Sequence, residues 1–370
     1  MRHALIIAGG KGTRLWPMST AAVPKQLIPF INGRSLLQLA VDRLAGLVPA
    51  DRVYVCAGAG HRQMMLDRID GLSEGRFIGE PTGRDTLNAV GLGTGVIERH
   101  DPEATVAVFT ADHIIEPIDT FQQTVEAGFT LAEGDATRLV TFGIEPNHAA
   151  TGYGYLELGS SLQAEVTTPG APASVVSRFK EKPDAATAEQ YLQAGPGQYL
   201  WNSGMFVWQA ATLRQCLERF AGDNHAGLQR AIDAVEAGDE ATLGEVYPTL
   251  PKTSVDYGIM EPAAADEATE VVAVPMPVQW LDVGSWPAYS EAREKDAAGN
   301  VAEATRALLE ETSNTTVVSD DPEHLVATLG CENLIVVHTK QATLVCHADH
   351  AQDLKALHEK VADQFGDRYV

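Results

Sequence analysis

The chain is short of positive charge, of cysteine and of long hydrophobic runs. Its 370 residues include 27 lysine and arginine residues against 50 aspartate and glutamate residues, for a net charge of -23. Because this charge repels nucleic acids and anionic membranes, we expect neither as a partner. The four cysteines are far apart, form no CxxC pair and have no metal-ligand spacing. This pattern favours a protein with reduced cysteines in the cytoplasm.

Membrane spans and secretion signals are also missing from the sequence. No apolar run approaches the length of a membrane span, and the apolar run after Met1 is too short for a signal peptide. The hydrophobic fraction of 45% is nevertheless enough for a sizeable core. Together with the length, it predicts a globular chain of two or three domains.

Acidic residues are absent from the first 41 positions, which contain a glycine-rich stretch. Ala4 to Pro17 reads A-L-I-I-A-G-G-K-G-T-R-L-W-P. Its apolar start predicts a buried strand, and the glycines that follow let the backbone approach a ligand. Lys11, Arg14 and Lys25 add charged donors for phosphate oxygens. The stretch therefore predicts a phosphate loop for a small polyanion such as a nucleoside triphosphate.

Two familiar phosphate loops do not fit this stretch. A Walker A motif needs serine or threonine after its lysine, but Gly12 follows Lys11. The dinucleotide fingerprint needs glycine where Leu15 stands. The loop is therefore of another kind.

Apolar strand patterns alternate with amphipathic helix patterns over most of the chain. We expect strands at 4–8, 53–57, near 77, 105–110, 139–143, 175–180 and 271–274, and helices at 36–44, 61–69, 85–99, 120–132, 185–193, 211–220 and 226–237. Such alternation predicts a largely parallel sheet. Asn202 to Gly204 is interpreted as a turn leading into a strand, and the region around 140–260 as an insertion that encloses a second ligand subsite.

The composition changes after a polar linker at 296–300. Short β-type runs at 315–318, 325–329, 334–337 and 342–345 recur about every ten residues, the spacing of an all-β unit. An amphipathic helix at 351–365 closes this part of the chain.

Two aspartates in apolar contexts are candidates for metal ligands. Asp112 follows the strand at 105–110, where ligands of open α/β sheets bind, and Asp282 lies in W-L-D-V-G. Two carboxylates with phosphate oxygens suit Mg²⁺. Each aspartate has an alternative role that involves no metal. Asp112 would then cap the N-terminus of a helix, and Asp282 would accept a hydrogen bond within its own turn. Lys182 is either a phosphate donor or an exposed lysine, and His113 is interpreted as a structural histidine.

The motifs occur in an order that resembles the sugar-1-phosphate nucleotidylyltransferase family, and within it the mannose-1-phosphate guanylyltransferase branch. They are A-G-G-K-G-T-R-L-W-P with P-K-Q, E-P-T-G-R-D-T, A-D-H, T-F-G-I-E-P with T-G-Y-G-Y, F-K-E-K-P, W-N-S-G-M-F, V-D-Y-G-I-M-E and L-D-V-G-S-W. The resemblance implies a Rossmann-like, GT-A-like α/β fold with a mixed, mainly parallel sheet flanked by helices. It also implies a catalytic domain over 1–295 and, over 301–370, a small β domain similar to a short left-handed β-helix.

The resemblance also implies a reaction and a set of residues. The reaction is transfer of GMP from GTP to α-D-mannose 1-phosphate by in-line attack, with Mg²⁺ as cofactor and a homodimer as the expected assembly. The catalytic residues would be Arg14, Lys25, Asp112 and Asp282, of which the two aspartates bind the metal. The nucleotide would be bound by Ala8, Gly9, Gly10, Gly12, Thr13, Arg14, Glu80, Pro81, Arg84, Asp85, Thr86 and Asp112. The sugar phosphate would be bound by Gly143, Gly152, Tyr153, Glu181, Lys182, Asn202, Ser203 and Asp256.

The chain departs from the family pattern in one motif. Residues 83–89 read G-R-D-T-L-N-A where the family usually has G-R-N-T-A-P-A, in a segment that helps to form the base pocket. Base selectivity therefore stays open, and a pyrophosphorylase for another nucleotide or hexose 1-phosphate is an alternative. A second alternative is a non-catalytic sugar-nucleotide sensor, against which the presence of Arg14, Lys25, Asp112 and Asp282 argues.

Overall fold

A computed structural model describes residues 1–10, 12–31, 33–162 and 165–370. Lys11, a predicted phosphate donor, lies outside these residues. The chain forms two compact units. Unit 1 comprises Met1–Gly9, Ala40–Ala111 and Ile115–Trp280, and unit 2 comprises Gly10–Leu39, Asp112–Ile114 and Leu281–Val370.

Unit 1 is an α/β structure. Its strands are β1 (Arg2–Ile7), β4 (Val53–Gly58), β5 (Phe77–Glu80), β6 (Thr105–Thr110), β8 (Arg138–Ile144), β9 (Tyr155–Ser161), β10 (Ser174–Lys180), β11 (Tyr199–Gln209) and β12 (Glu270–Pro275). Its helices are α2 (Arg62–Arg68), α3 (Asp85–His100), α4 (Ile118–Gly134), α5 (Ala185–Ala194), α6 (Ala210–Phe220), α7 (Gly222–Ala237), α8 (Glu240–Val246) and α9 (Glu261–Ala263).

These strands form one mixed, nine-stranded sheet in the order β5-β4-β1-β6-β11-β8-β12-β10-β9. The neighbours β5, β4, β1 and β6 are parallel, and so are β8 and β12, whereas β11 is antiparallel to both β6 and β8. The predicted sheet flanked by helices is therefore confirmed. The strands β8 to β11, which belong to the region interpreted as an insertion, are part of this same sheet.

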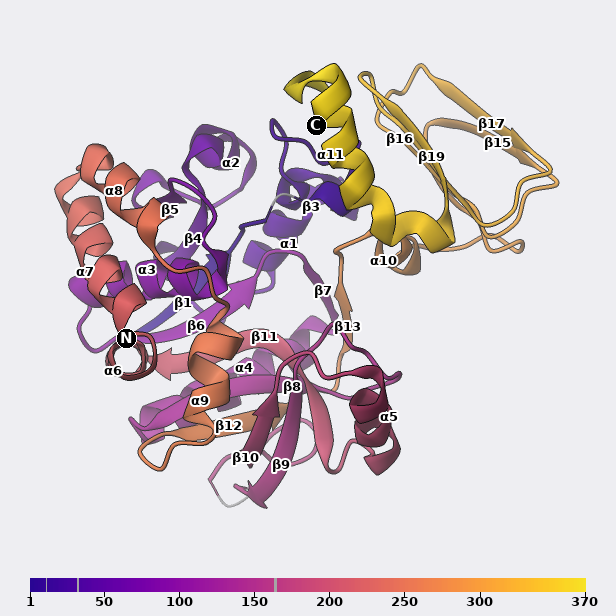
Figure 1. Ribbon diagram of the computed structural model, residues 1–370. Coiled ribbons are helices and arrows are strands. Elements are labelled where there is room, and N and C mark those ends of the chain that lie inside the picture. The colour runs from indigo at the N-terminus through magenta and orange to yellow at the C-terminus, as the bar shows by residue number, and fades with distance from the viewer. Residues whose placement is uncertain (11, 32, 163–164) are drawn as a thin grey trace. The chain divides into compact units, whose positions relative to one another are not determined.

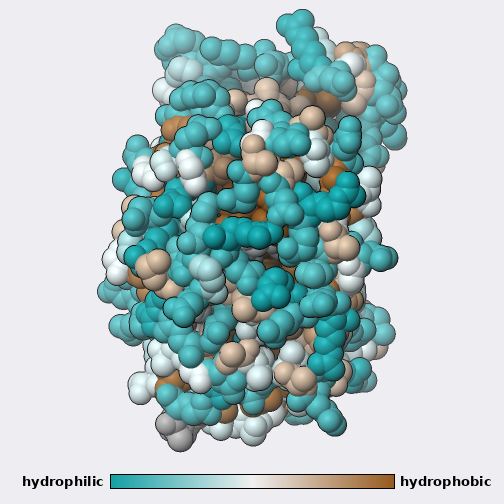
Figure 2. All heavy atoms as spheres, turned by 90° about the vertical axis from the view of Figure 1, so that its left-hand side faces the viewer, coloured by the Kyte–Doolittle hydropathy of each residue, from teal (hydrophilic) through white to brown (hydrophobic). Residues whose placement is uncertain are grey.

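Helices cover both faces of the sheet because buried strands alternate their side chains between the faces. Val106 and Val108 of β6 belong to the core that includes α3, α6 and α7, and Figure 1 shows these three helices together. Phe109 points to the other face, where its ring centroid lies 5.6 Å from that of Phe121 in α4. In Figure 2, which shows the face that carries α7 and α8, most side chains are hydrophilic, in keeping with the acidic composition.

Unit 2 contains the small β domain. The elements of unit 2 outside this domain are β2 (Pro29–Ile31), β3 (Arg34–Ser35) and α10 (Trp286–Glu291). The domain itself contains β14 (Val301–Glu303), β15 (Arg306–Glu310), β16 (Thr316–Ser319), β17 (Leu325–Leu329), β18 (Leu334–His338), β19 (Thr343–His347) and α11 (Leu354–Phe365). The elements α1 (Leu36–Asp42), β7 (His113–Glu116) and β13 (Gln279–Asp282) continue across the unit boundaries, and β7 pairs with β13. The neighbouring strands β14, β16 and β18 are parallel to one another, and β15 is parallel to β17, which agrees with the expected β-helix-like domain.

A hydrophobic core of unit 2 includes residues from both ends of the sequence. Trp16 and Phe30 share it with Trp286, Tyr289 and Val337. The Phe30 and Tyr289 rings meet edge to face at 4.7 Å, and the indole nitrogen of Trp286 donates to the carbonyl of Trp16 at 3.0 Å. The segment after Gly9 therefore packs against the C-terminal part of the chain.

The structure differs from the sequence predictions at three places. The predicted turn at Asn202–Gly204 is a bulge inside the continuous strand β11, whose register shifts between Asn202 and Phe206 while Gly204 adopts a φ of 70°. The first two strands of the C-terminal domain, β14 and β15, were not predicted, because both are short and mostly exposed and so lack a buried apolar run. The helix expected to start at 36 ends at Asp42 rather than at 44, although the hydroxyl of Ser35 does accept from the amide of Gln38.

No helix in the described part of the chain is both long enough and apolar enough to cross a membrane.

Candidate functional site

The glycine-rich loop enters unit 2 through a close backbone approach at Gly12. This residue has a φ of 63°, and a Cβ there would lie 2.5 Å from the hydroxyl oxygen of Ser19 and 2.8 Å from Cβ of Lys25. Only glycine fits such a position. The next residues form a 3-10 turn, Thr13–Leu15, in which Leu15 is buried and Arg14 exposed.

Arg14 presents its guanidinium toward the C-terminal domain of unit 2. Its Nη1 donates to Oε1 of Gln352 at 3.1 Å. A Cβ on Gly284 would lie 3.1 Å from Nη2 of Arg14 and 3.4 Å from Oδ1 of Asp282. The absence of a side chain at Gly284 therefore leaves room for the Arg14 guanidinium and the Asp282 carboxylate on the same side of the loop that follows β13.

Lys25 and Asp112 form a buried ion pair in unit 2. The side chains are 11% and 20% exposed. Burial alone would raise the pKa of Asp112, but the Lys25 ammonium outweighs it and holds that pKa below its ordinary value. The carboxylate is thus ionised at neutral pH, as a metal ligand must be.

Asp112, His113 and Asp282 form a group that is able to hold a divalent metal ion. Their ligand atoms all lie within 4.8 Å of one another. The amide of Val283 donates to the carbonyl of Asp112 at 3.0 Å, which ties the two aspartate-bearing segments together. The two carboxylates suit Mg²⁺, which prefers oxygen ligands, whereas an imidazole is more typical of transition metals. His113, interpreted from the sequence as structural, is buried at the edge of the group, with Nε2 4.0 Å from Oδ1 of Asp112.

Four of the residues predicted for the sugar phosphate meet in unit 1. Lys182 pairs with the buried carboxylate of Glu181 at 2.8 Å, and Nδ2 of Asn202 donates to Oδ1 of Asp256 at 2.7 Å. The hydroxyl of Thr141 donates to Oδ1 of Asn202 at 2.7 Å and fixes the orientation of the amide. Lys182 also has a φ of 44°, a left-handed conformation that few non-glycine residues adopt.

The charges of this group influence one another. Burial raises the pKa of Asp256 to about 6, and the Glu181 carboxylate adds to the effect. Burial acts to lower the pKa of Lys182, but Glu181 outweighs it, so that this pKa lies above its ordinary value. Lys182 is therefore a fully charged donor, half exposed at the edge of the group.

The other residues predicted for the sugar phosphate range from buried to exposed. Gly143 pairs with Asn202 in the sheet, and Ser203 is buried, its hydroxyl accepting from the amide of Met205 at 3.3 Å. The Tyr153 ring meets the Trp201 ring edge to face at 5.2 Å. Gly152 is exposed.

Unit 1 also holds part of the set predicted for the nucleotide. Ala8 follows β1 and donates its amide to the carbonyl of Cys56 at 2.8 Å. Glu80 is 5% exposed at the end of β5 and accepts from the Tyr247 hydroxyl at 2.7 Å. Burial raises the pKa of Glu80, although the Tyr247 bond opposes it. A Cβ on Gly9 would lie 3.6 Å from Oε2 of Glu80.

Arg84, Asp85 and Thr86 form the turn that opens α3. Asp85 has a φ of 68°, and its Oδ1 accepts from the amide of Thr86 at 2.8 Å. Nε of Arg84 is buried and has no hydrogen-bond partner in the described part of the chain, so it is a donor suited to a ligand acceptor. Pro81 is exposed.

Sequence reasoning did not identify Thr141, Tyr247 or Gln352, the partners of Asn202, Glu80 and Arg14. Each is far from its partner in the sequence, the hydrogen-bonded pairs being separated by 61, 167 and 338 positions. Thr141 opens the T-F-G-I-E-P motif, which gave it no role of its own, and Tyr247 and Gln352 lie outside the quoted motifs, so the local sequence did not point to these contacts.

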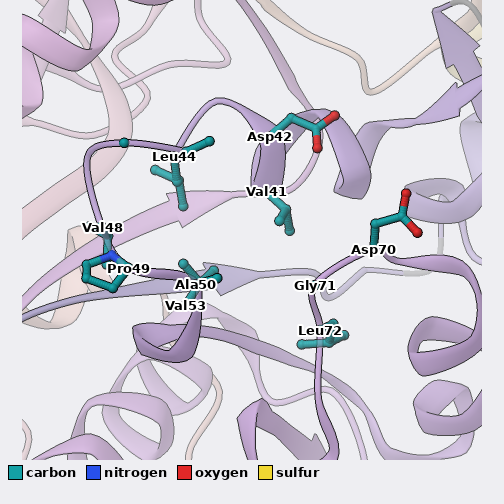
Figure 3. A pocket seen from close by; sticks show the side chains of 12 residues that line it. Val41, Asp42, Leu44, Val48, Pro49, Ala50, Val53, Asp70, Gly71 and Leu72 are labelled. Carbon is teal, nitrogen blue, oxygen red and sulfur yellow. The ribbon is translucent and has the colours of Figure 1, made fainter.

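A separate cavity of about 430 Å³ lies in unit 1 between the end of α1 and the segment before β5. Figure 3 shows the apolar side chains of Val41, Leu44 and Leu72 in it, with the carboxylates of Asp42 and Asp70 beside them. Its lining includes none of the residues predicted for either substrate.

Comparisons with known proteins agree over nearly the whole chain. The nucleotidyl transferase family pattern matches residues 3–299, and that of a mannose phosphate isomerase/GMP-like β-helix domain matches residues 306–361. A mannose-1-phosphate guanylyltransferase from Klebsiella pneumoniae is 37% identical over 95% of this chain and 72% of its own length. One from Escherichia coli strain K12 is 34% identical over 97% of this chain and 73% of its own length.

A solved structure is also similar in fold and sequence. It comes from Thermus thermophilus and is described as a mannose-1-phosphate geranyltransferase. It has a TM-score of 0.82 and 31% identity, and the match covers 97% of this chain and 99% of that one.

Proposed function

The chain belongs to the nucleotidyl transferase family, and we propose that it transfers GMP from GTP to α-D-mannose 1-phosphate, giving GDP-mannose and pyrophosphate. The observation that carries the proposal is the grouping of Lys25, Asp112 and Asp282 in unit 2, the unit that also contains the glycine-rich loop from Gly10 onward. A lysine paired with one of two carboxylates that are able to share a metal ion suits a triphosphate with its metal ion better than a sugar alone.

The proposed reaction needs no protein nucleophile. An oxygen of the mannose 1-phosphate attacks the α-phosphorus of GTP, a new P–O bond forms, and the bond from the α-phosphorus to the bridging oxygen of pyrophosphate breaks. The attacking phosphate is already ionised at neutral pH, so positioning is the main requirement. Arg14 and Lys25 would neutralise charge at the α-phosphorus and on the departing pyrophosphate.

Asp112 and Asp282 would hold Mg²⁺, which when bound neutralises phosphate charge and orients the triphosphate. Both are carboxylates with ligand atoms within 4.8 Å, so they fit a cation that takes few protein ligands and several from phosphate and water. His113 would stay outside this ligand set, because Mg²⁺ favours oxygen donors.

On the sugar side, Lys182 would bind the phosphate of mannose 1-phosphate. Asn202, Glu181 and Asp256 would bind sugar hydroxyls, since they offer both amide donors and carboxylate acceptors. We also propose 1–295 as the functional catalytic domain and 301–370 as a domain that supports it.

A homodimer is part of the proposal. Leu308, Leu325 and Leu329 of the adjacent strands β15 and β17 are 58%, 59% and 71% exposed, which is unusual for leucine in a sheet. Solution mass by light scattering checks this point, and a monomer at assay concentration would contradict it.

A pyrophosphate-release assay tests the function. The four nucleoside triphosphates are each combined with mannose, glucose and galactose 1-phosphate in the presence of Mg²⁺. We expect the GTP and mannose 1-phosphate pair to give the highest kcat/KM. Preference for another pair would change the assignment within the family, and no turnover with any pair would favour a non-catalytic sensor.

The first prediction is that Asp282→Asn lowers kcat by about 100-fold or more, since one metal ligand loses its charge. Thermal unfolding should stay near that of the wild type. Asp363→Asn on the exposed face of α11 is the matched control and should leave kcat unchanged. Near-normal turnover of Asp282→Asn would remove this residue from the metal site.

A further inference from the structure

Unit 1 contains a buried pair of amide side chains, Asn88 of α3 and Asn224 of α7, which are 0% and 4% exposed. Nδ2 of Asn224 donates at 2.9 Å both to Oδ1 of Asn88 and to the carbonyl of Pro251. Nδ2 of Asn88 donates to the carbonyl of Arg84 at 2.6 Å and to that of Pro251 at 2.9 Å. The two amides therefore tie three distant stretches of the chain together.

Further contacts join the same stretches. The amide of Leu87 donates to the carbonyl of Thr253 at 3.3 Å, and the amide of Val255 donates to the hydroxyl of Thr86 at 3.0 Å. A Cβ on Gly258 would lie 2.3 Å from Cδ1 of Leu87, so the leucine packs directly on that glycine. Leu87 and Asn88 are the two residues that replace a small residue and proline of the family pattern. The two residues at which this chain differs from the family pattern thus make specific contacts with the segment 251–258.

The turn held by this bridge is strained. Asp85 has a φ of 68°, which is unfavourable for a residue with a side chain. Such a conformation persists when its surroundings fix it, and it is frequent at binding sites. Here Asn88 fixes the carbonyl before Asp85, and the Asp85 carboxylate fixes the amide after it.

We propose that Asn88 and Asn224 are positioning residues that fix the Arg84–Thr86 turn and thereby set nucleotide affinity and base selectivity. This inference rests on the proposed assignment of that turn to the nucleotide. Both amides act from inside the protein, through the carbonyls of Arg84 and Pro251. A buried carbonyl that loses its hydrogen-bond donor is left unsatisfied, and this penalty favours displacement of the strained turn.

The test uses Asn88→Asp and Asn224→Asp at about pH 8, because an aspartate has the shape of the amide but offers no hydrogen-bond donor when ionised and only one when protonated, against two in asparagine. We expect the Kd of GTP, measured by calorimetry, to rise about tenfold in each variant, which corresponds to about 1.4 kcal/mol. The ratio of kcat/KM for GTP to that for ATP should fall by a similar factor. The kcat at saturating GTP should stay within about threefold of the wild type, because the reacting groups are untouched.

Two further variants keep the test decisive. Thr94→Val is the matched control, since Thr94 lies on the same helix, is 2% exposed and has a hydroxyl without a partner in the described residues. Its Kd for GTP should equal that of the wild type. Asn224→Ser retains one donor, so its Kd should fall between those of the wild type and Asn224→Asp, and it serves if the aspartate variant does not fold.

Wild-type values of the Kd and of the GTP to ATP ratio in folded Asn88→Asp and Asn224→Ser would overturn the inference. A lower melting temperature with an unchanged Kd of GTP and an unchanged GTP to ATP ratio would also overturn the inference, because the two asparagines would then contribute to stability alone. Failure of the proposed function is seen separately, as absence of turnover by the wild type, because the Kd does not depend on turnover. A wild type that does not bind GTP would overturn both.

Discussion

At the scale of single residues, the same type of side chain has different properties in the two units. Asp112 lies beside the Lys25 ammonium, which lowers its pKa, whereas Asp256 lies beside the Glu181 carboxylate, which helps burial to raise its pKa. Both aspartates are predicted for the site, but only the first is held in the charged form by a direct ion pair. The second titrates close to neutral pH.

Asp256 gives a prediction about pH and stability. Its pKa is about 6 in the folded protein against an ordinary value of 3.8, so folding favours the protonated form. This contribution to stability is complete below the ordinary pKa and is lost as the pH rises through about 6. We expect Asp256→Asn, which stays neutral, to be more stable than the wild type at pH 7.5, on the order of 2 kcal/mol.

The difference in the free energy of unfolding between Asp256→Asn and the wild type should disappear as the pH falls to about 4. Urea unfolding across this pH range measures it, with Asp67→Asn on the exposed face of α2 as control. A difference that does not vary with pH would show that Asp256 has no raised pKa. We also expect weaker binding of mannose 1-phosphate by Asp256→Asn, because a stable neutral group replaces a proposed acceptor.

At the scale of elements, α3 lies close to its neighbours because it carries glycines on two sides. A Cβ on Gly91 would lie 2.6 Å from Leu228 of α7, and a Cβ on Gly93 would lie 2.5 Å from Leu5 of β1. Glycine weakens an isolated helix by about 1 kcal/mol, so these residues are explained by packing rather than by propensity. The close fit holds the first turn of α3, and with it Arg84 to Thr86, near the sheet.

Gly93→Ala should lower the free energy of unfolding by about 1 to 2 kcal/mol, since overpacking against Leu5 exceeds the gain in helix propensity. Three atoms of Leu5 lie within 3.1 Å of the new Cβ, and a strand in the core has little room to move. Gly134→Ala at the end of α4 is the control, since a Cβ there meets nothing within 4 Å. Chemical denaturation compares the two. Equal stability of both variants would mean that the core adapts to the methyl group.

At the scale of the whole molecule, the described units do not follow the order of the sequence. The segment Gly10–Leu39 belongs to the same compact unit as Leu281–Val370. Their common core contains Trp16 and Val337, and the indole nitrogen of Trp16 donates to the carbonyl of Tyr369 at 2.6 Å. The C-terminal β domain therefore supports the loop that is proposed to bind the triphosphate.

Val337→Ala should test this support. Val337 is 0% exposed in β18, and its truncation should cost about 2 kcal/mol through a cavity. Because the loop shares the core, we expect the Kd of GTP to rise about threefold as well, or about 0.7 kcal/mol. Val345→Ala on the neighbouring strand β19 is the control, since Val345 is 62% exposed. A destabilised Val337→Ala protein with a wild-type Kd would show that the loop is held independently of the β domain.

Much of the fold was predictable from the sequence because it depends on local patterns, and the grouping of Asp112 with Asp282 was predicted as well. The apolar runs of β1 and β6 and the helix over α3 were predicted within one or two residues, as their periodicity is strong. The motifs that contain Lys25 and Asp282 suggested the family, and the comparisons confirm it. The residue types of these motifs and their order were thus enough to predict the reaction class.

The sequence by itself determined most helices and strands of unit 1, the motifs and the family of this protein. Only the tertiary structure decided that Asn202–Gly204 is a bulge and that Arg14 meets Gln352. It also decided that Asn88 meets Asn224. The physical reason is that these features depend on hydrogen bonds and packing between positions far apart in the chain, and no local periodicity reports such contacts.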